Sequence, residues 1–199
     1  TGRISRIVVH PTNPDVAYAA ALGHGYKPQQ ERGIYKTTDG GKTWKQVLHV
    51  DKNTGASDLV MDPFNPRILF AGMWSLEIRP WTRTSGGPGG GIYRSTDGGE
   101  TWTNMGLRDS YLISRIVVHP TDADRVYVAA MGHLWGANSE RGVFRTVDGG
   151  RSWEQVLFVT VGEGAPRTML TAQKVRGFEV GTEYFVVYHE NARASTGAD

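Results

Sequence analysis

Short apolar runs alternate with polar turns rich in glycine and proline along the first 159 residues. In the first third of the chain these runs occupy residues 4–9, 16–22, 34–37 and 43–50. Runs of about four to eight residues, rich in β-branched side chains and bounded by turn residues, are typical of strands. No stretch has a helical apolar period of useful length, so a solenoid of αβ repeats is the weaker interpretation. The pattern predicts four short strands.

The same four runs recur twice, at residues 59–61, 68–74, 91–95 and 101–104 and at residues 113–118, 125–131, 142–146 and 152–159. Residues 5–50 match residues 114–159 without a gap at about 26 of 46 positions, and a weaker copy covers residues 57–105. Units of four strands at this spacing are typical of propeller blades. The sequence therefore predicts an all-β fold with three blades, at about 1–54, 55–109 and 110–159, and a tail at 160–199.

A closed propeller normally has about four to eight blades. Three blades predict an incomplete propeller with exposed blade faces and open strand edges. We therefore expect further blades to cover these faces, or the isolated chain to self-associate.

An octad with the pattern Ser/Thr-x-Asp-x-Gly-x-Thr/Ser-Trp lies between the third and fourth run of each unit. Its Asp-Gly-Gly segment supplies the positive-φ residues of a tight hairpin, and the Asp can accept hydrogen bonds from its own turn. Each Asp repeats with its blade, which favours a structural role over metal binding or catalysis. The structural set is Thr37, Asp39, Gly41 and Trp44; Ser95, Asp97, Gly99 and Trp102; and Thr146, Asp148, Gly150 and Trp153.

Charge and composition narrow the range of partners. The 22 basic and 20 acidic residues give a net charge of +2 without a block of like charge, which argues against nucleic acid and anionic membranes as partners. The chain has no cysteine, and the sequence indicates no cofactor and no metal site. Its apolar runs fall short of the roughly 20 residues that span a bilayer. A first residue other than Met and the lack of a signal peptide predict a piece of a longer protein.

Residues that interrupt the repeat are the better candidates for binding. The middle unit contains a glycine-rich insertion at residues 75–90, which we expect to be a long loop. Its aromatic and charged side chains could form a platform for a sugar or an acidic peptide, with Glu77 as a hydrogen-bond acceptor. The alternative is that the loop covers a blade edge and Trp74 is core. The predicted set is Trp74, Glu77, Arg79, Trp81 and Arg83.

Two further sites are candidates for binding or catalysis. The loops at residues 23–30 and 132–139 carry His24, Tyr26, His133 and Trp135, each followed by Glu-Arg-Gly, and this repetition favours a structural hydrogen bond or ion pair over ligand binding. Asp58 stands where the other two units have arginine, so it places a negative charge among positive ones. A single carboxylate does not make a glycosidase, which needs two at a defined separation.

The octads resemble the Asp boxes of sialidases, sortilin-type receptors, oligoxyloglucan hydrolases and photosystem-assembly propellers. With His-Pro after the first strand and Glu-Arg-Gly before the third, the chain most resembles bacterial sortilin-like proteins with BNR repeats, which are often labelled glycosyl hydrolases. The resemblance covers residues 1 to about 159. It implies a propeller that binds peptide or glycan in an extracytoplasmic or secreted setting.

The resemblance also bears on catalysis. Oligoxyloglucan hydrolases carry a catalytic Asp in a Thr-Asp-Val-Gly-Gly stretch, whereas the matching residues 21–24 and 131–133 have no Asp. We therefore expect a binding or scaffold module without catalytic residues of its own. The alternative is a fragment of a propeller glycoside hydrolase whose catalytic pair is completed by other blades.

The tail does not continue the repeat. Residues 174–180 and 183–189 are predicted strands around Gly-Thr, and the last ten residues are small and polar. A partial fourth blade and a cap are both open interpretations of residues 160–199.

Overall fold

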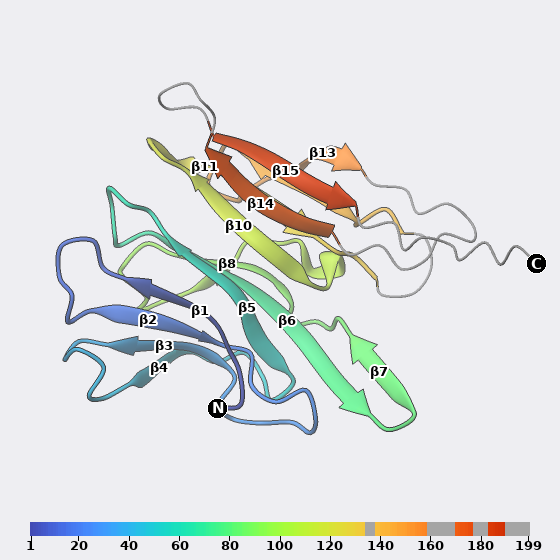
Figure 1. The fold of residues 1–199 in the computed structure, drawn as a ribbon, viewed down its shortest axis with the longest axis horizontal. Coiled ribbons are helices and arrows are strands. Elements are labelled where there is room, and N and C mark those ends of the chain that lie inside the picture. The colour runs from blue at the N-terminus through green and yellow to red at the C-terminus, as the bar shows by residue number, and fades with distance from the viewer. Residues whose placement is uncertain (134–137, 159–169, 177–182, 190–199) are drawn as a thin grey trace, which may run out of the picture.

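The computed structural model describes residues 1–133, 138–158, 170–176 and 183–189, the last two ranges as backbone only. The described residues form β-strands and one short 3-10 helix, η1 (Arg108–Ser110). The predicted all-β fold is confirmed, and three antiparallel sheets correspond to the three repeats (Figure 1). No helix in these ranges is long and apolar enough to cross a membrane.

Each repeat gives one sheet whose strands follow chain order. The first contains β1 (Ile4–Val9), β2 (Ala17–Ala21), β3 (Gly33–Thr37) and β4 (Lys45–Leu48). The second contains β5 (Thr54–Met61), β6 (Leu69–Arg79), β8 (Gly91–Ser95) and β9 (Thr103–Asn104), with β7 (Thr82–Ser85) paired to β6. The third contains β10 (Ile113–His119), β11 (Asp122–Ala130), β12 (Gly142–Thr146) and β13 (Glu154–Phe158).

The structure of the insertion in the middle blade differs from the one that the sequence predicted. Residues 75–90 were expected to be a long loop, but β6 continues to Arg79 and pairs with β7 as a hairpin. Alternation of apolar and polar residues along 75–79 and the threonines of β7 suit a strand, and only the glycines that follow form a loop. The hairpin projects from one end of the blades (Figure 1).

The hydrophobic core lies between the blades rather than within one of them. Leu69, Ala71 and Met73 of β6 pack with Ala56 and Leu59 of β5 against the first blade. Phe70, the intervening residue of β6, packs against the third blade. Successive strand residues point to opposite faces, so one strand serves two blade interfaces and reads as a continuous apolar run.

A serine at a β-bulge joins the first strands of the first and second blades to the blade that follows. Ser5 donates from its hydroxyl to the Ala20 carbonyl of its own blade and, at 2.6 Å, to the Ala56 carbonyl of the second blade. Ser57 repeats this contact, donating to the Ile113 carbonyl of the third blade at 2.7 Å. The bulge shifts the strand register at this serine in each blade and so directs the hydroxyl toward the neighbour.

The tail supplies two described strands, β14 (Leu170–Arg176) and β15 (Glu183–His189), paired antiparallel. The observed β14 begins four residues before the predicted strand at 174–180, while β15 has the predicted bounds. β14 lies against β10 and β11 of the third blade, as β5 lies against β1 and β2 of the first. Its position thus matches that of a blade's first strand.

Candidate functional site

Each Asp box is a closed hydrogen-bonded unit. Asp39 accepts from the Thr43 amide at 2.9 Å, the Thr43 hydroxyl at 2.6 Å and the Thr37 hydroxyl at 2.8 Å. Thr37 in turn accepts from the Gly41 amide at 3.0 Å. Asp97 and Asp148 repeat this arrangement in their own turns. The carboxylates are engaged within the turn, as the sequence predicted.

Hydrogen bonding at each box favours the ionised carboxylate. The pKa of Asp39 is lowered to about 2, with the Thr43 hydroxyl and amide as the largest causes. The pKa values of Asp97 and Asp148 are also well below the usual range, for the same reason, through Thr101 and Ser152. A carboxyl group with so low a pKa cannot act as a general acid near neutral pH. The boxes therefore suit structure better than acid–base chemistry.

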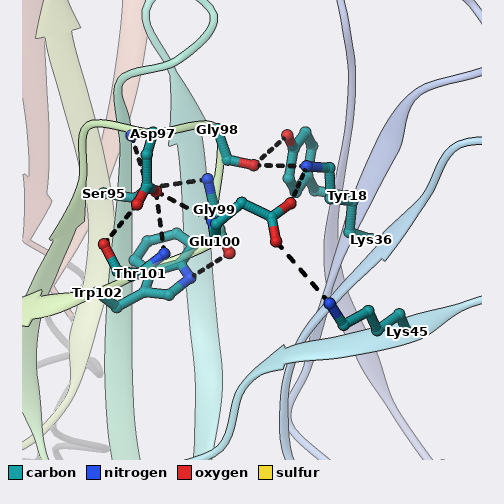
Figure 2. A network of polar contacts seen from close by, with 10 residues as sticks. All are labelled: Tyr18, Lys36, Lys45, Ser95, Asp97, Gly98, Gly99, Glu100, Thr101 and Trp102. Carbon is teal, nitrogen blue, oxygen red and sulfur yellow. Dashed lines mark hydrogen bonds and ion pairs between the residues drawn. The ribbon is translucent and has the colours of Figure 1, made fainter.

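The Asp box of the second blade is also a contact point for the first blade (Figure 2). Tyr18 of β2 donates to the Gly98 carbonyl at 2.7 Å, and Lys36 of β3 donates to the same carbonyl at 2.9 Å. Lys36 also forms an ion pair with Glu100 at 2.7 Å. Burial has the largest single effect and lowers the pKa of Lys36, but the hydrogen bond to Glu100, the Glu100 charge and the contact with Tyr18 together outweigh it, so the pKa of Lys36 is raised.

The contact between the second and third blades repeats this design with different residues. Arg94 of β8 takes the place of Lys36, donates to the Gly149 carbonyl at 3.3 Å and forms an ion pair with Asp124 at 3.0 Å. Its guanidinium lies 5.5 Å from the ring centre of Phe70, which takes the place of Tyr18. A basic residue over an aromatic ring thus holds the box of the following blade.

Sequence reasoning missed these contacts, although a signal was present. The residue just before the Ser/Thr of each box is always basic: Lys36, Arg94 and Arg145. The tryptophans also differ: the Trp44 and Trp102 indoles donate within their own turns, whereas Trp153 donates to the Met105 carbonyl of the preceding blade at 2.7 Å.

The two loops with Gly-His are held by the arginine of Glu-Arg-Gly. Arg32 is buried and donates to the carbonyls of His24 and Leu76. Arg141 donates to the carbonyls of His133 and Met131, at 2.8 and 2.9 Å. The guanidinium groups bind loop backbone, which is the structural role favoured by the repetition. Tyr26 is exposed, while Trp135 lies outside the described residues.

A stacked pair of rings joins the third-blade loop to the link between blades. Tyr111 and His133 lie parallel with ring centres 4.1 Å apart. The Tyr111 backbone has φ of 57°, and its ring lies against Gly86, where a Cβ would collide with it. Tyr111 is outside the repeat, and no sequence pattern singles it out.

The candidate residues of the hairpin fall into a buried group and an exposed group. Trp74 is buried, donates to the Ser85 hydroxyl at 2.9 Å and lies 5.8 Å from the Arg83 guanidinium. Trp74 is therefore core, and its ring is not presented to solvent. Trp81 at the hairpin turn is 78% exposed, and Glu77 pairs with Arg79 at 3.0 Å. The exposed face of the hairpin thus offers Trp81 and charged groups.

Asp58 lies where the first strands of the three blades meet. Its carboxylate is buried, accepts from the Ile116 amide at 2.8 Å and lies 4.0 Å from the Arg6 guanidinium. Burial raises the pKa of Asp58, against the opposing effects of the Ile116 amide and Arg115. Asp58, the acidic residue that replaces the arginine of the other two repeats, thus contacts both the first and the third blade. Among the described residues, no group of three or more His, Asp or Glu could hold a metal ion.

The comparison with protein families decides the nature of the repeats. The BNR/Asp-box repeat model matches residues 35–46 and 93–104, the first two of the three octads. The chain is built of Asp-box propeller blades. A GH74 enzyme from Niastella koreensis matches 77% of the chain with a TM-score of 0.57 at 23% identity, and an ancestral GH74 enzyme matches 97% at 17% identity with the same TM-score. These matches show the propeller fold.

Similarity in sequence extends to curated glycan-degrading proteins. A probable oligoxyloglucan-reducing end-specific xyloglucanase from Neosartorya fischeri is 26% identical over 165 residues, which is 75% of the chain and 17% of that protein. The Niastella koreensis structure is covered over 22% of its length. The Asp-box blades thus span about a fifth of these relatives.

Proposed function

We propose that these Asp-box blades form part of the glycan-binding surface of a propeller glycoside hydrolase, and that the catalytic carboxylate pair belongs to other blades. The observation that carries this proposal is Trp81, a large aromatic side chain that is exposed on the β6–β7 hairpin, which breaks the repeat. Exposed aromatic rings bind the apolar faces of sugar rings. The xyloglucanase named above supports the ligand class.

The charged neighbours of Trp81 fit the same purpose. Glu77 and Arg79 form an ion pair on the hairpin and together offer both hydrogen-bond acceptors and donors. Arg83 lies over the buried Trp74 ring, and this contact links β7 to β6. Polar groups on a fixed frame select hydroxyl positions with little cost in side-chain entropy.

The carboxylates of these blades do not favour catalysis. Those of the Asp boxes are hydrogen-bonded in their own turns and have low pKa values. Asp58 is buried and bound to the Ile116 amide. Retaining and inverting glycosidases need two carboxyl groups at a separation of about 5 to 10 Å on either side of a sugar. We therefore place the acid and the base in blades that adjoin these.

Two measurements test the proposal. Isothermal titration calorimetry with xyloglucan oligosaccharides measures binding, and a reducing-end assay measures hydrolysis. We expect measurable binding without hydrolysis, and Trp81→Ala should weaken binding by about 1 to 3 kcal/mol, the range for losing an aromatic anchor. Phe64→Ala is the matched control, because Phe64 is equally exposed but lies at the opposite end of β6.

Three outcomes would contradict the proposal. Equal loss of binding in both variants would remove the hairpin as the binding surface. Hydrolysis by the chain alone would show that its own carboxylates suffice. Binding of an acidic peptide but of no glycan would favour the scaffold function instead.

A further inference from the structure

The loop of the first blade at residues 23–30 lies against the hairpin of the second blade. The Ile78 amide of β6 donates to the Gly25 carbonyl at 2.8 Å, and a Cβ on Gly25 would collide with the Ile78 side chain. Ile78 also packs on the apolar cluster that contains Leu22 and Trp74. The loop and the hairpin lie at the same end of the blades (Figure 1). Residues 23–30 and 76–85 thus share one surface, the loop–hairpin surface.

Two polar side chains hold the loop. Gln29 accepts from the His24 amide at 3.0 Å and donates to the carbonyls of His24 and Lys27 at 3.0 and 3.3 Å. Arg32, which is buried, donates to the His24 carbonyl of the loop and to the Leu76 carbonyl of β6. Gln29 therefore closes the loop on itself, and Arg32 ties the loop to the hairpin. Both restrict the conformations that are open to the loop.

The backbone of the loop is strained next to its aromatic residue. Lys27 has φ of 65° and precedes Pro28, whereas a residue before proline favours an extended conformation. Such strain persists only where surrounding contacts hold it, and it is concentrated at binding sites. The bond from Gln29 to the Lys27 carbonyl is one of these contacts. The strained turn carries Tyr26, which is 65% exposed.

The loop–hairpin surface thus carries two exposed aromatic residues, one from each blade. Tyr26 follows Gly25 directly, at the contact with Ile78. Trp81 is 78% exposed and stands in the turn between β6 and β7. At about 3.3 Å per residue, the three residues from Ile78 to Trp81 carry that turn about 10 Å beyond the contact. A sugar ring that stacks on Trp81 therefore leaves Tyr26 accessible to another ring of the same chain.

We propose that Tyr26 is a second aromatic contact for the glycan, and that the ligand is a chain of several sugar units lying across the first and second blades. Aromatic rings stack on the apolar faces of sugars, and Glu77 and Arg79 beside Ile78 offer hydrogen-bonding groups to the hydroxyls. The inference rests on the function proposed above, because it adds a second contact to the surface of Trp81.

This assignment separates two roles within the loop. The repetition of Gly-His and Glu-Arg-Gly favours a structural role for the loop, and Arg32 and Gln29 have that role. The Tyr26 side chain is exposed instead. A chain that reaches both rings gains affinity from the second contact because its first contact already holds it nearby. A disaccharide, which reaches one ring, does not.

The length dependence of binding tests the second contact. Xyloglucan oligosaccharides are compared with cellobiose, by titration calorimetry for the former and by NMR titration for the latter. We expect Tyr26→Ala to weaken binding of the oligosaccharides about tenfold and to change that of cellobiose less than about twofold. Phe64→Ala, at an equally exposed aromatic residue at the other end of the blades, is the control and should change neither.

Gln29→Ala tests whether the loop positions Tyr26. It should weaken binding of the oligosaccharides in the original chain and have no further effect in Tyr26→Ala, because the ring that it positions is then absent. Gln30→Ala, at the adjacent exposed glutamine, is the matched control. Thermal melts of all variants show whether the fold is retained. Equal losses from Gln29→Ala with and without Tyr26 would overturn the positioning role.

The remaining outcomes distinguish this inference from the function on which it rests. Weaker binding in Trp81→Ala but not in Tyr26→Ala would overturn the second contact and leave the proposed function standing. Equal losses for cellobiose and the oligosaccharides in Tyr26→Ala would overturn the chain that spans both blades. An original chain that binds no glycan would overturn both proposals.

Discussion

Single residues in this protein act mainly by completing the hydrogen bonds of tight turns. The three Asp-box carboxylates accept bonds from amides and hydroxyls of their own octads. An amide that loses its acceptor is left with a free-energy penalty when the turn cannot open to water. These contacts are consistent with the prediction that the repeated Asp stabilises its turn.

Removal of one such carboxylate should lower stability without changing ligand binding. We expect Asp97→Ala to lower the melting temperature by several degrees, because the amides of Glu100 and Thr101 lose their acceptor. Asp109→Ala, at an exposed aspartate of η1, should have little effect. Thermal melts followed by circular dichroism measure both. A normal melt with lost glycan binding in Asp97→Ala would make the box a functional site.

Asp58 should have the opposite pH dependence to the Asp boxes. Its pKa is raised by burial, so the ionised form weakens the fold at neutral pH, and this cost disappears below the unfolded pKa of about 3.8. The box aspartates have lowered pKa values, so their stabilisation is complete above about pH 4 and is lost as the pH falls toward 2.

We therefore expect Asp58→Asn to raise the melting temperature at pH 7 and to have a smaller effect at pH 3.5. Asparagine keeps an oxygen that can accept from the Ile116 amide. Melting curves of both proteins over this pH range, compared as differences, measure the effect. A lower melting temperature at pH 7 would show that attraction to Arg6 and Arg115 outweighs the cost of burial.

At the scale of elements, the third strand of each blade starts at a glycine with no room for a side chain. Gly91 begins β8 with φ of 103°, and an added Cβ would meet the Gly106 carbonyl. Gly33 and Gly142 begin β3 and β12 in the same way. This close approach lets the fourth strand return tightly along the third, which explains the glycine that ends Glu-Arg-Gly and Gly-Gly-Gly.

Adjacent glycines give a matched pair for testing this. Gly91→Ala should destabilise the chain by about 2 to 4 kcal/mol, through both its φ and its collision with the Gly106 carbonyl. Gly90→Ala should cost less than Gly91→Ala, because its φ is not positive and the nearest atom to its Cβ, the Gly87 carbonyl oxygen, lies 3.3 Å away rather than 2.3 Å. Urea denaturation compares them. Equal effects would mean that the glycines serve only as a flexible spacer.

At the scale of the whole molecule, stability comes from the contacts between blades. The two large cores each combine residues of neighbouring blades, and the Gly98 carbonyl receives both Tyr18 and Lys36 of the first blade (Figure 2). Each blade therefore depends on its neighbours, as in other repeat proteins.

A double-mutant cycle at this carbonyl measures the coupling. Tyr18→Phe and Lys36→Met should each lower the free energy of unfolding by about 1 kcal/mol. The pair should lose more than the sum, by about 0.5 kcal/mol or more, because either donor alone satisfies the acceptor and only the double variant leaves the Gly98 carbonyl without a partner. Additive losses in urea denaturation would show that the two donors act independently.

The sequence by itself determined the four-stranded repeats, their strand order and the hydrogen-bonded turns of the Asp boxes. These features depend on local chemistry: a turn closes on its own Asp and glycines, and alternating apolar residues define strands wherever they occur. The arginines of Glu-Arg-Gly could also be assigned from repetition, since Arg32 and Arg141 bind the backbone of their own loops.

Only the tertiary structure decided which residues meet across blades. Local patterning does not reveal that Ile7 is exposed and Ile116 buried, because the two stand in identical surroundings in the sequence. The same holds for the division of the hairpin, where Trp74 is core and Trp81 is exposed although both are tryptophans of one insertion. Burial depends on which blade lies opposite, and that partner is many residues away along the chain.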